Sequence, residues 1–446
     1  MSKHTQIGRD DISPIQSSEK TMGIGNTIFL WIAATLVIPT VATGQLFVPD
    51  VSPYGAFGTV IIASLIGCIA LAAIAIIGTK TGLPTFVASR ATFGHNGSKI
   101  FAALNIVILC GWQMIQGYMG GLALNQVLIG VFSYDDIVLS IFVTQAIVLI
   151  ITILGHTGIQ KIEGITSSFM LVVAFVVIYT LLDKHGLTKL EQLPLSESPG
   201  LTYAIIFDIV LATAFSWMAL PCDHNRYCKS VKTSASGITI GYLSGTMIAM
   251  GLGIAVGAYS IIEGFEPTYD PSQLLEGNFG IAAALVMFLS VATTNVLNLY
   301  SIVMSTMSIV PKTKFSLITI IFGLFCLSGS FLQETLMASF FDWILLVGAL
   351  IIPVFAIMLS DYYLINKSNL NVDAVLDPLH PKYRFYKGVN LNAIFTYVIS
   401  STGSFYFTYY QPLDIGVTAL TFICTAIIYL ILSKLLPSNN QIISDR

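Results

Sequence analysis

A run of polar side chains interrupts the apolar segment between residues 280 and 310. It extends from Ser290 to Asn298 and reads SVATTNVLN, so hydroxyl and amide groups crowd into nine residues. Polar side chains inside a membrane helix are costly, and they usually face a cavity or a partner helix. Hydroxyl and amide oxygens are also the neutral ligands that a hard cation prefers. The run therefore predicts a site for a coupling ion and a solute.

The composition indicates that this site lies in a polytopic membrane protein. Hydrophobic residues make up 55% of the chain and charged residues 10%, and the mean hydropathy is +0.82. A soluble globular domain carries roughly a quarter charged residues. The basic residues form no patch, so no nucleic-acid partner is expected. The six cysteines lack metal-ligand spacing and are expected to be buried thiols.

Twelve apolar stretches predict membrane spans, because a helix needs roughly 20 apolar residues to cross about 30 Å of hydrocarbon. They lie near residues 24–48, 56–79, 100–131, 136–155, 164–183, 202–221, 236–262, 278–310, 315–333, 339–364, 388–410 and 413–436. The first 22 residues are polar, and we expect them to be a short disordered tail rather than a cleaved signal peptide.

The distribution of basic residues predicts the orientation of these spans. With twelve spans, 18 of the 20 Lys and Arg residues fall on one side, and only Lys184 and Lys189 fall on the other. The positive-inside rule makes the populated side cytoplasmic. We therefore expect a multi-pass protein of the plasma (cytoplasmic) membrane with both termini in the cytoplasm.

Other membrane functions have little support in the sequence. No repeated filter sequence or ring of acidic residues indicates a channel. HExxH, GxSxG and Walker motifs are absent, and the histidines fall near loops or in the first tail, so no enzyme is expected. A non-transporting sensor or receptor ranks low because both predicted tails are short.

Prolines predict interruptions in two of the spans. Pro39 and Gly44 lie in the first span, and Pro221 lies at the end of the sixth. Proline removes a backbone donor and glycine loosens a helix, so that freed carbonyls can bind a cation. Single prolines are common in membrane helices. Interruptions at corresponding positions of two halves, however, are typical of a binding site near the membrane midplane.

The third span carries an aromatic ring and an amide on one face. Trp112 and Gln116 are four residues apart and therefore share a helix face. The pair suits a flat ring rich in heteroatoms, because the tryptophan stacks on the ring and the amide reads its donors and acceptors. Trp112 lies roughly 18 Å into the span at 1.5 Å per residue, which is too deep for an interfacial tryptophan. Gln113 points elsewhere and is expected to bond a neighbouring helix.

Five stretches of the chain, in order, carry a family resemblance. They are GTKTGLPTFVASRATFG at 78–94, Gly111-Trp112, Ser216-Trp217 with Asp223 and Arg226-Tyr227, ATTN at 292–295, and Ile352-Pro353 with SDYY at 360–363. On these motifs the chain resembles the nucleobase:cation symporter family, of the purine–cytosine permease and hydroxymethylpyrimidine transporter type.

The resemblance implies an all-α integral membrane protein with alternating access around a midplane site. Its fold would be twelve transmembrane helices in a LeuT-type five-plus-five inverted repeat, with two extra C-terminal helices. The implied parts are a cytoplasmic tail at 1–23, a first repeat at 24–183, a second repeat at 202–364, the appended helices at 388–436 and a cytoplasmic tail at 437–446.

The resemblance also implies substrate-binding residues. They are Trp112, Gln116, Phe215, Trp217, Asn295 and Gln45. Trp112 looks like the stacking tryptophan of the family, and either Phe215 or Trp217 looks like its partner on helix six. Asn295 looks like the amide that reads the polar edge of the ring, with Gln45 and Gln116 as additional amides.

A sodium site is implied beside the substrate site. Thr293 and Thr294 look like the ligating hydroxyls on helix eight, and carbonyls near Ala34 and Val37 on helix one would complete the ion shell. In this interpretation Asn298 and Ser290 lose rank, because the first lies a turn further along and the second can simply pack against a neighbouring helix.

Three charged residues near helix six receive separate interpretations. Asp223 and Arg226 are expected to form a structural or gating ion pair at the cytoplasmic end of the helix. Asp208 lies in the apolar run YAIIFDIVLA and departs from the cytosine permease pattern. It could carry a coupling proton, pair with an exocyclic amine of the substrate, or be a hydrated acid near the outer end of the helix.

The sequence therefore predicts cation-coupled import of a nucleobase-like heterocycle such as cytosine, a purine or hydroxymethylpyrimidine. Sodium is the expected coupling ion, and no cofactor or obligate protein partner is expected beyond the substrate, the cation and the lipid bilayer. Proton-coupled transport of hydantoin or allantoin stays open as an alternative. An amino-acid symporter of the same fold is disfavoured, because the candidate site is aromatic and amide-rich rather than built to bind a carboxylate.

Overall fold

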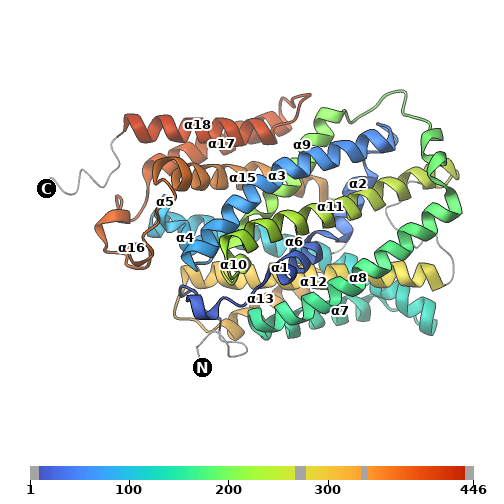
Figure 1. Cartoon of the computed structure of the whole chain (residues 1–446), viewed down its shortest axis with the longest axis horizontal. Helices are drawn as coiled ribbons and strands as arrows, with labels where there is room; N and C mark the ends of the chain where they lie inside the picture. Colours follow the sequence, from blue (N-terminus) through green and yellow to red (C-terminus); the bar gives the residue numbers. More distant parts are fainter. Residues whose placement is uncertain (1–9, 267–277, 333–339, 437–446) are drawn as a thin grey trace.

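The computed structural model describes residues 10–266, 278–332 and 340–436, and these residues form helices joined by short loops. The long helices run side by side along the longest axis of the molecule (Figure 1). The predicted tail at 437–446 and the first nine residues of the predicted tail at 1–23 lie outside the described residues.

The longer helices account for most of the described chain. They are α3 (Pro53–Thr81), α6 (His95–Phe132), α7 (Ile137–Ile153), α8 (Gly155–His185), α11 (Val231–Ile262), α12 (Asn278–Ile309), α13 (Phe315–Gly329), α15 (Phe340–Leu359), α17 (Leu391–Tyr409) and α18 (Thr418–Leu435). The short element η2 (Ser17–Glu19) precedes them, and others lie between them: α4 (Thr85–Ala88), α5 (Arg90–Phe93), η3 (Leu187–Gln192), the π-helical η6 (Ser360–Ile365), α16 (Val372–Leu376) and η7 (Pro381–Tyr383).

Fewer than twelve of the described helices meet a strict criterion of length and apolarity for crossing a membrane. Among the described residues, seven helices are long and apolar enough to cross a membrane, and the broken first helix makes an eighth. The helices α7, α13 and the pair α9–η4 are apolar but shorter. Each of the twelve predicted ranges contains a helix or a helix pair, and the count of twelve membrane spans stays a prediction.

The two predicted interruptions are confirmed. In the first span, α1 (Ile24–Thr35) and α2 (Ile38–Gln45) meet at 58°, separated by Leu36 and an extended Val37. In the sixth, α9 (Tyr203–Ser216) tightens into the 3-10 turn η4 (Trp217–Ala219) before α10 (Pro221–Asn225). Proline lies in the first turn of both α2 and α10, where a missing N–H costs little.

Two groups of packed helices form the core. In one group, α1, α2 and α3 pack on α11, and α9 packs on α3; in the other, α6 and α7 pack on α12, and α13 packs on α7. Glycines on α11 allow the first group to pack closely: a Cβ at Gly253 would overlap the Val41 carbonyl oxygen of α2, and one at Gly241 would meet the Ile28 carbonyl of α1. Both halves of the broken helix therefore lie against one continuous helix.

The segment from residue 10 to residue 22 is ordered, so the prediction of a disordered tail is wrong for these residues. Ile15 and Met22 are buried, and the Ile15 N–H donates to the Gly82 carbonyl at 3.0 Å. Met22 pairs through its backbone with the chain around Cys228. The apolar residues of this segment gain burial by packing against the ends of the helices.

The cysteine prediction holds for five of the six residues. Cys68, Cys110, Cys222, Cys228 and Cys326 are buried free thiols. Cys424 on α18 is exposed, so the expectation of a buried thiol is wrong at this position. The helix α18 that carries it lies at the edge of the bundle (Figure 1).

Candidate functional site

A pocket lies between the two groups of helices, beside both interruptions. Its lining comes from α2 and the residue before it, α6, the α9–η4 region, α12 and α15. Its cavity volume is about 70 Å³. The lining residues are Val37, Pro39, Thr40, Thr43, Leu109, Trp112, Gln116, Ala212, Thr213, Ser216, Trp217, Leu220, Asn298, Ile344, Val347 and Gly348. Every one of them is uncharged.

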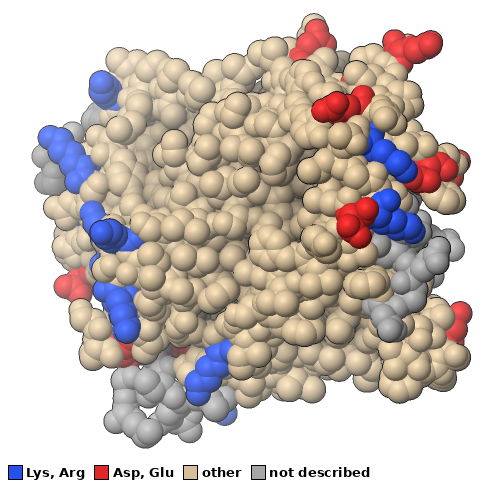
Figure 2. Space-filling view, turned by 45° about the vertical axis from the view of Figure 1, so that its right-hand side comes forward, with Lys and Arg blue, Asp and Glu red and all other residues tan. Residues whose placement is uncertain are grey.

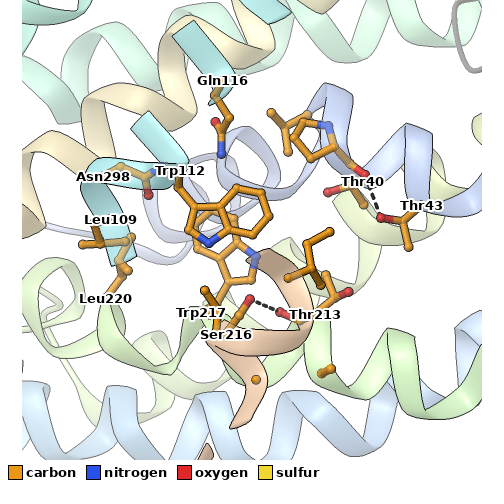
Figure 3. Close-up of a pocket in the computed structure, with 16 residues that line it drawn as sticks. Thr40, Thr43, Leu109, Trp112, Gln116, Thr213, Ser216, Trp217, Leu220 and Asn298 are labelled. Carbon is orange, nitrogen blue, oxygen red and sulfur yellow. Dashed lines mark hydrogen bonds between the residues drawn. The ribbon is translucent and has the colours of Figure 1, made fainter. Parts of the chain in front are cut away.

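Two tryptophans from different helices line the middle of the pocket. Trp112 comes from α6 and Trp217 from η4, and Figure 3 shows both indole rings in the centre of the site. The ring of Trp217 also meets Trp31 of α1 edge-on, with centroids 6.2 Å apart and an interplanar angle of 78°. These aromatic surfaces can hold a flat ring by stacking.

The structure distinguishes the two aromatic candidates on helix six. Trp217 lines the pocket, whereas Phe215 packs against Phe422 of α18 with ring centroids 4.8 Å apart. The difference follows from helical geometry, since residues two apart point in different directions on a helix. Trp217 is therefore the geometric partner of Trp112.

Hydroxyl and amide groups surround the aromatic surfaces. Gln116 is buried and lines the pocket, and its Oε1 has no hydrogen-bond partner among the described residues. The hydroxyl of Thr43 donates to the Pro39 carbonyl at 2.7 Å, and that of Ser216 donates to the Thr213 carbonyl at 2.7 Å (Figure 3). An unpaired buried amide oxygen is costly unless a ligand or water pairs with it.

Three amides differ from their predicted places. Asn298, which the sequence interpretation ranked low, lines the pocket. Asn295 does not line it: this side chain is fully buried and donates to the Gln113 carbonyl at 3.2 Å. Gln45 packs beside Gly257 of α11, outside the pocket lining. Asn298 lies four residues after Thr294, so helical spacing could have assigned it to the same face as the ion site.

A cluster of neutral oxygens lies next to this pocket, where α12 meets the first interruption. The Thr294 hydroxyl lies 3.0 Å from the Ala33 carbonyl oxygen, 3.4 Å from that of Ala34 and 2.8 Å from that of Ser290. The Thr293 hydroxyl lies 3.0 Å from the Ser290 carbonyl oxygen. Ala34, Thr293 and Thr294 are thus brought together as the sequence suggested, and Ala33 and Ser290 join them.

The Val37 carbonyl has a different environment. It accepts the backbone N–H groups of Thr40 and Val41, at 2.9 and 3.1 Å, and so begins α2. Carbonyl and hydroxyl oxygens without a carboxylate suit a monovalent hard cation such as sodium better than a transition metal. Among the described residues, no group of three or more His, Cys, Asp or Glu side chains could hold a metal ion.

Asp208 is occupied by the backbone of another helix. Its carboxylate accepts hydrogen bonds from the N–H groups of Val417 at 2.9 Å, Thr418 at 2.9 Å and Ala419 at 3.3 Å. These are donors at the N-terminus of α18, where a negative charge is favourable. Asp208 lies outside the pocket lining, and its geometry is that of a helix cap.

Asp223 and Arg226 do not pair with each other, so the predicted ion pair is wrong. The Asp223 carboxylate accepts the Thr85 N–H of α4 at 2.8 Å. Arg226 donates to the Asp11 carbonyl at 3.1 Å and lies 3.2 Å from the Tyr300 hydroxyl. Each of the two side chains thus has a backbone or hydroxyl partner of its own.

The chain is similar to known transporters along most of its length. A family model described as "Permease for cytosine/purines, uracil, thiamine, allantoin" matches residues 14–432. An allantoin permease of Bacillus subtilis is 26% identical over 423 residues, which cover 87% of this chain and 84% of the relative. A purine-uracil permease of Arabidopsis thaliana is 26% identical over 422 residues, covering 87% and 69%.

Solved structures share the fold. The transporter Mhp1 in a closed conformation with bromovinylhydantoin bound superposes with a TM-score of 0.81 at 19% identity, covering 96% of both chains. Mhp1 in an inward-facing conformation gives a TM-score of 0.77, again at 19% identity, covering 95% of this chain and 94% of the other. The match along residues 14–432 and the shared helical arrangement agree, and the chain belongs to the nucleobase:cation symporter family.

Proposed function

We propose that this protein imports an uncharged nucleobase-like heterocycle, such as cytosine, a purine or hydroxymethylpyrimidine, together with sodium by alternating access. Membership of the family supports the coarser statement, that the chain is a cation-coupled transporter of heterocyclic substrates. The observation that carries the finer proposal is the adjacency of the Trp112–Trp217 pocket and the oxygen cluster around Thr294.

The lining of the pocket supports an uncharged, flat substrate. A carboxylate or an amine held at such a site would require an opposite charge or a set of converging backbone dipoles. The lining residues offer aromatic faces together with hydroxyl and amide groups, among them Gln116 and Asn298. These groups can pair with the ring nitrogens and carbonyl oxygens of a heterocycle.

The same elements reach both the ion cluster and the pocket. The interruption of the first helix contributes carbonyl oxygens to the cluster and Val37, Pro39 and Thr40 to the pocket. On α12, Thr294 and Asn298 lie one turn apart. An ion that orders these elements favours the state that binds the solute, and the solute must favour ion binding to the same extent.

Proton-coupled transport of hydantoin or allantoin is the second candidate. The allantoin permease among the relatives and the hydantoin derivative bound to Mhp1 support the alternative substrate. Coupling through Asp208 has less support, because the carboxylate caps α18 rather than facing the pocket. Sodium is favoured by the neutral oxygen cluster.

The proposed topology has twelve spans and both termini in the cytoplasm. Figure 2 supports the asymmetry of charge: on the face drawn, one end carries mostly Lys and Arg, and the opposite end carries mostly Asp and Glu. The positive-inside rule would place the basic end in the cytoplasm.

Uptake into proteoliposomes tests the proposal. The purified protein is reconstituted, and uptake of radiolabelled cytosine is measured with an inward sodium gradient, with an inward proton gradient and with neither. Competition with unlabelled adenine, hydroxymethylpyrimidine, hydantoin and allantoin then ranks the substrates. The proposal expects sodium-driven uptake in which a base or hydroxymethylpyrimidine competes. Uptake driven by protons alone, or competition by hydantoin or allantoin only, would favour the second candidate.

A further inference from the structure

A second cavity lies apart from the heterocycle pocket. It is bounded by the first turn of α3, the last turns of α8, the 3-10 helix η3 and the middle of α11, and its volume is about 410 Å³. None of its lining residues belongs to the heterocycle pocket. It is therefore a separate feature of the fold.

The walls of this cavity are apolar. Phe57, Leu182, Ile248 and Leu252 are typical of the lining, and Tyr54 contributes the one polar side-chain group among the described lining residues. That hydroxyl is already used, because it donates to the Leu187 carbonyl at 3.1 Å. Water needs two to four polar partners to occupy a cavity. An apolar occupant therefore fits the walls better than water does.

The cavity lies on the surface that faces lipid. Tyr54 is 50% exposed and Leu187 54% exposed, although both line the cavity. The adjoining face of α8 exposes Phe175 and Tyr179 at 59% and 70%. In a membrane protein, large apolar side chains exposed in this way along a long helix contact hydrocarbon. A lipid chain can therefore enter from the side.

The depth of the cavity matches part of an acyl chain. On α11 the lining extends from Met247 to Ala255, a length of roughly 12 Å at 1.5 Å per residue. Half of the hydrocarbon core of a bilayer is about 15 Å thick. The cavity is thus long enough to hold most of an acyl chain that extends through one leaflet.

Charges of both signs flank the η3 end of the cavity. Lys184 and Lys189 lie within a few residues of lining residues on α8 and η3, and they are the two basic residues that the predicted topology leaves on this side. Lys189 Nζ lies 3.0 Å from Glu263 Oε1. Hydrogen bonds from Lys189 and then from His185 lower the pKa of Glu263.

We propose that this cavity binds one acyl chain of a phospholipid with a zwitterionic headgroup. The chain runs along α8 and α11, and the headgroup lies at η3. Its phosphate is near Lys184 and Lys189, and its amine is near Glu263. A purely anionic headgroup or a fatty acid would bring no positive charge to pair with Glu263.

Photochemical labelling of the full-length protein in nanodiscs tests the site. The probe is phosphatidylethanolamine with a diazirine on one acyl chain, and the labelled peptides are identified by mass spectrometry. We expect labelling concentrated in residues 178–190 and 247–255. The variant Ala255→Trp fills the cavity and should lower this labelling about tenfold, because the indole and the chain cannot occupy one volume.

A matched control uses an exposed alanine elsewhere on the lipid face. Ala103 of α6 is exposed, and Ala103→Trp should leave the labelling of residues 178–190 unchanged. Ala255→Leu serves as a smaller change if the tryptophan variant fails to fold. Labelling spread evenly over all lipid-facing helices, or unchanged by substitution at Ala255, would overturn the proposal. It would show that the probe contacts the protein only as ordinary boundary lipid.

The headgroup is tested with the same labelled chain on other lipids. Phosphatidylethanolamine and phosphatidylcholine should label the cavity more than phosphatidylglycerol does, and Lys189→Ala should reduce the difference. Stronger labelling by phosphatidylglycerol would overturn the zwitterionic assignment. Equal labelling by a diazirine fatty acid would show that no phospholipid headgroup is recognised.

Discussion

The two interrupted helices of this transporter break in different ways. Between α1 and α2 the chain leaves the helical conformation at Leu36 and Val37, and the axis bends by 58°. Between α9 and α10 the backbone stays helical: Trp217 and Leu220 keep right-handed helical dihedrals, and the Leu220 N–H donates to the Trp217 carbonyl at 3.0 Å.

The interruption between α1 and α2 exposes backbone carbonyl oxygens, and the one between α9 and α10 places a side chain in the pocket. An extended residue uncovers carbonyl oxygens, and the Thr294 hydroxyl lies near two of them, those of Ala33 and Ala34. A 3-10 turn keeps its carbonyls paired but winds more tightly than an α-helix, so the following residues change direction. Trp217 begins this turn and lines the pocket, whereas Phe215, two residues earlier on α9, packs against α18.

The largest effect on uptake is expected at the interruption between α1 and α2, where backbone carbonyl oxygens lie near Thr294. Thr294→Val should lower sodium-driven uptake about 100-fold, since losing a hydrogen-bonding or ligating oxygen beside a charge costs about 1.5–3 kcal/mol. Thr294→Ser keeps the hydroxyl and should retain most of the uptake. The measurement is initial uptake rate against sodium concentration. Unchanged sodium dependence in Thr294→Val would contradict an ion site at this interruption.

The second largest effect on transport is expected at Trp217, in the interruption between α9 and α10. Trp217→Ala should raise the KM for the heterocycle about tenfold, because stacking of a base on an aromatic side chain is worth about 1–3 kcal/mol. The sodium concentration at half-maximal rate should change much less. Phe215→Ala is the matched control, and it should lower thermal stability without a comparable change in KM. A larger KM effect at Phe215 than at Trp217 would reverse the assignment.

Variants of Asn298 and Asn295 allow an amide that lines the pocket to be compared with a buried amide outside the lining. Asn298→Ala should raise KM about threefold to tenfold, as expected for one hydrogen bond of about 0.5–1.5 kcal/mol. Asn295→Ala removes the bond to the Gln113 carbonyl and should act mainly on stability. Substrate titration and thermal unfolding of both variants separate the two effects. If only Asn295→Ala changes KM, the amide predicted from the family resemblance is the one that reads the ring.

The smallest effect on transport is expected at Asp208. Asp208→Asn weakens the cap of α18, and loss of such a cap typically costs about 0.5–2 kcal/mol of stability. The pH dependence of uptake should stay as in the wild type, because the carboxylate faces backbone N–H groups. The test is uptake measured between about pH 5 and pH 8, together with the melting temperature. Disappearance of the pH dependence would restore the coupling-proton interpretation.

Much of the fold could be predicted because apolar length is a local property. The broken helices follow from Pro39 and Pro221, and the glycines of α11 permit the packing that holds α1 and α2 together. The ordered segment at 10–22 could not be predicted, since its burial depends on helix ends far away in the sequence. The exposure of Cys424 likewise depends on which face of α18 the bundle covers.

The candidate site was predicted in part for the same reason. Trp112 and Gln116 share a helix face by spacing alone, and the structure brings them to one pocket. Asp208 and Phe215 looked like site residues from the sequence, but their partners lie on α18, about 200 residues away. The sequence around a residue does not predict a contact with a partner so far along the chain.

Sequence patterns alone predicted the membrane class, the family resemblance, the two interruptions and the polar run on the eighth predicted span. These depend on side-chain type and on spacing along one helix. The packing of the helices was needed to show which amide faces the pocket, which aromatic side chain of helix six joins Trp112, and why Asp208 is tolerated in an apolar run. The reason is physical: a buried polar group is stable only where its partner lies, and the partner comes from the packing of helices distant in sequence.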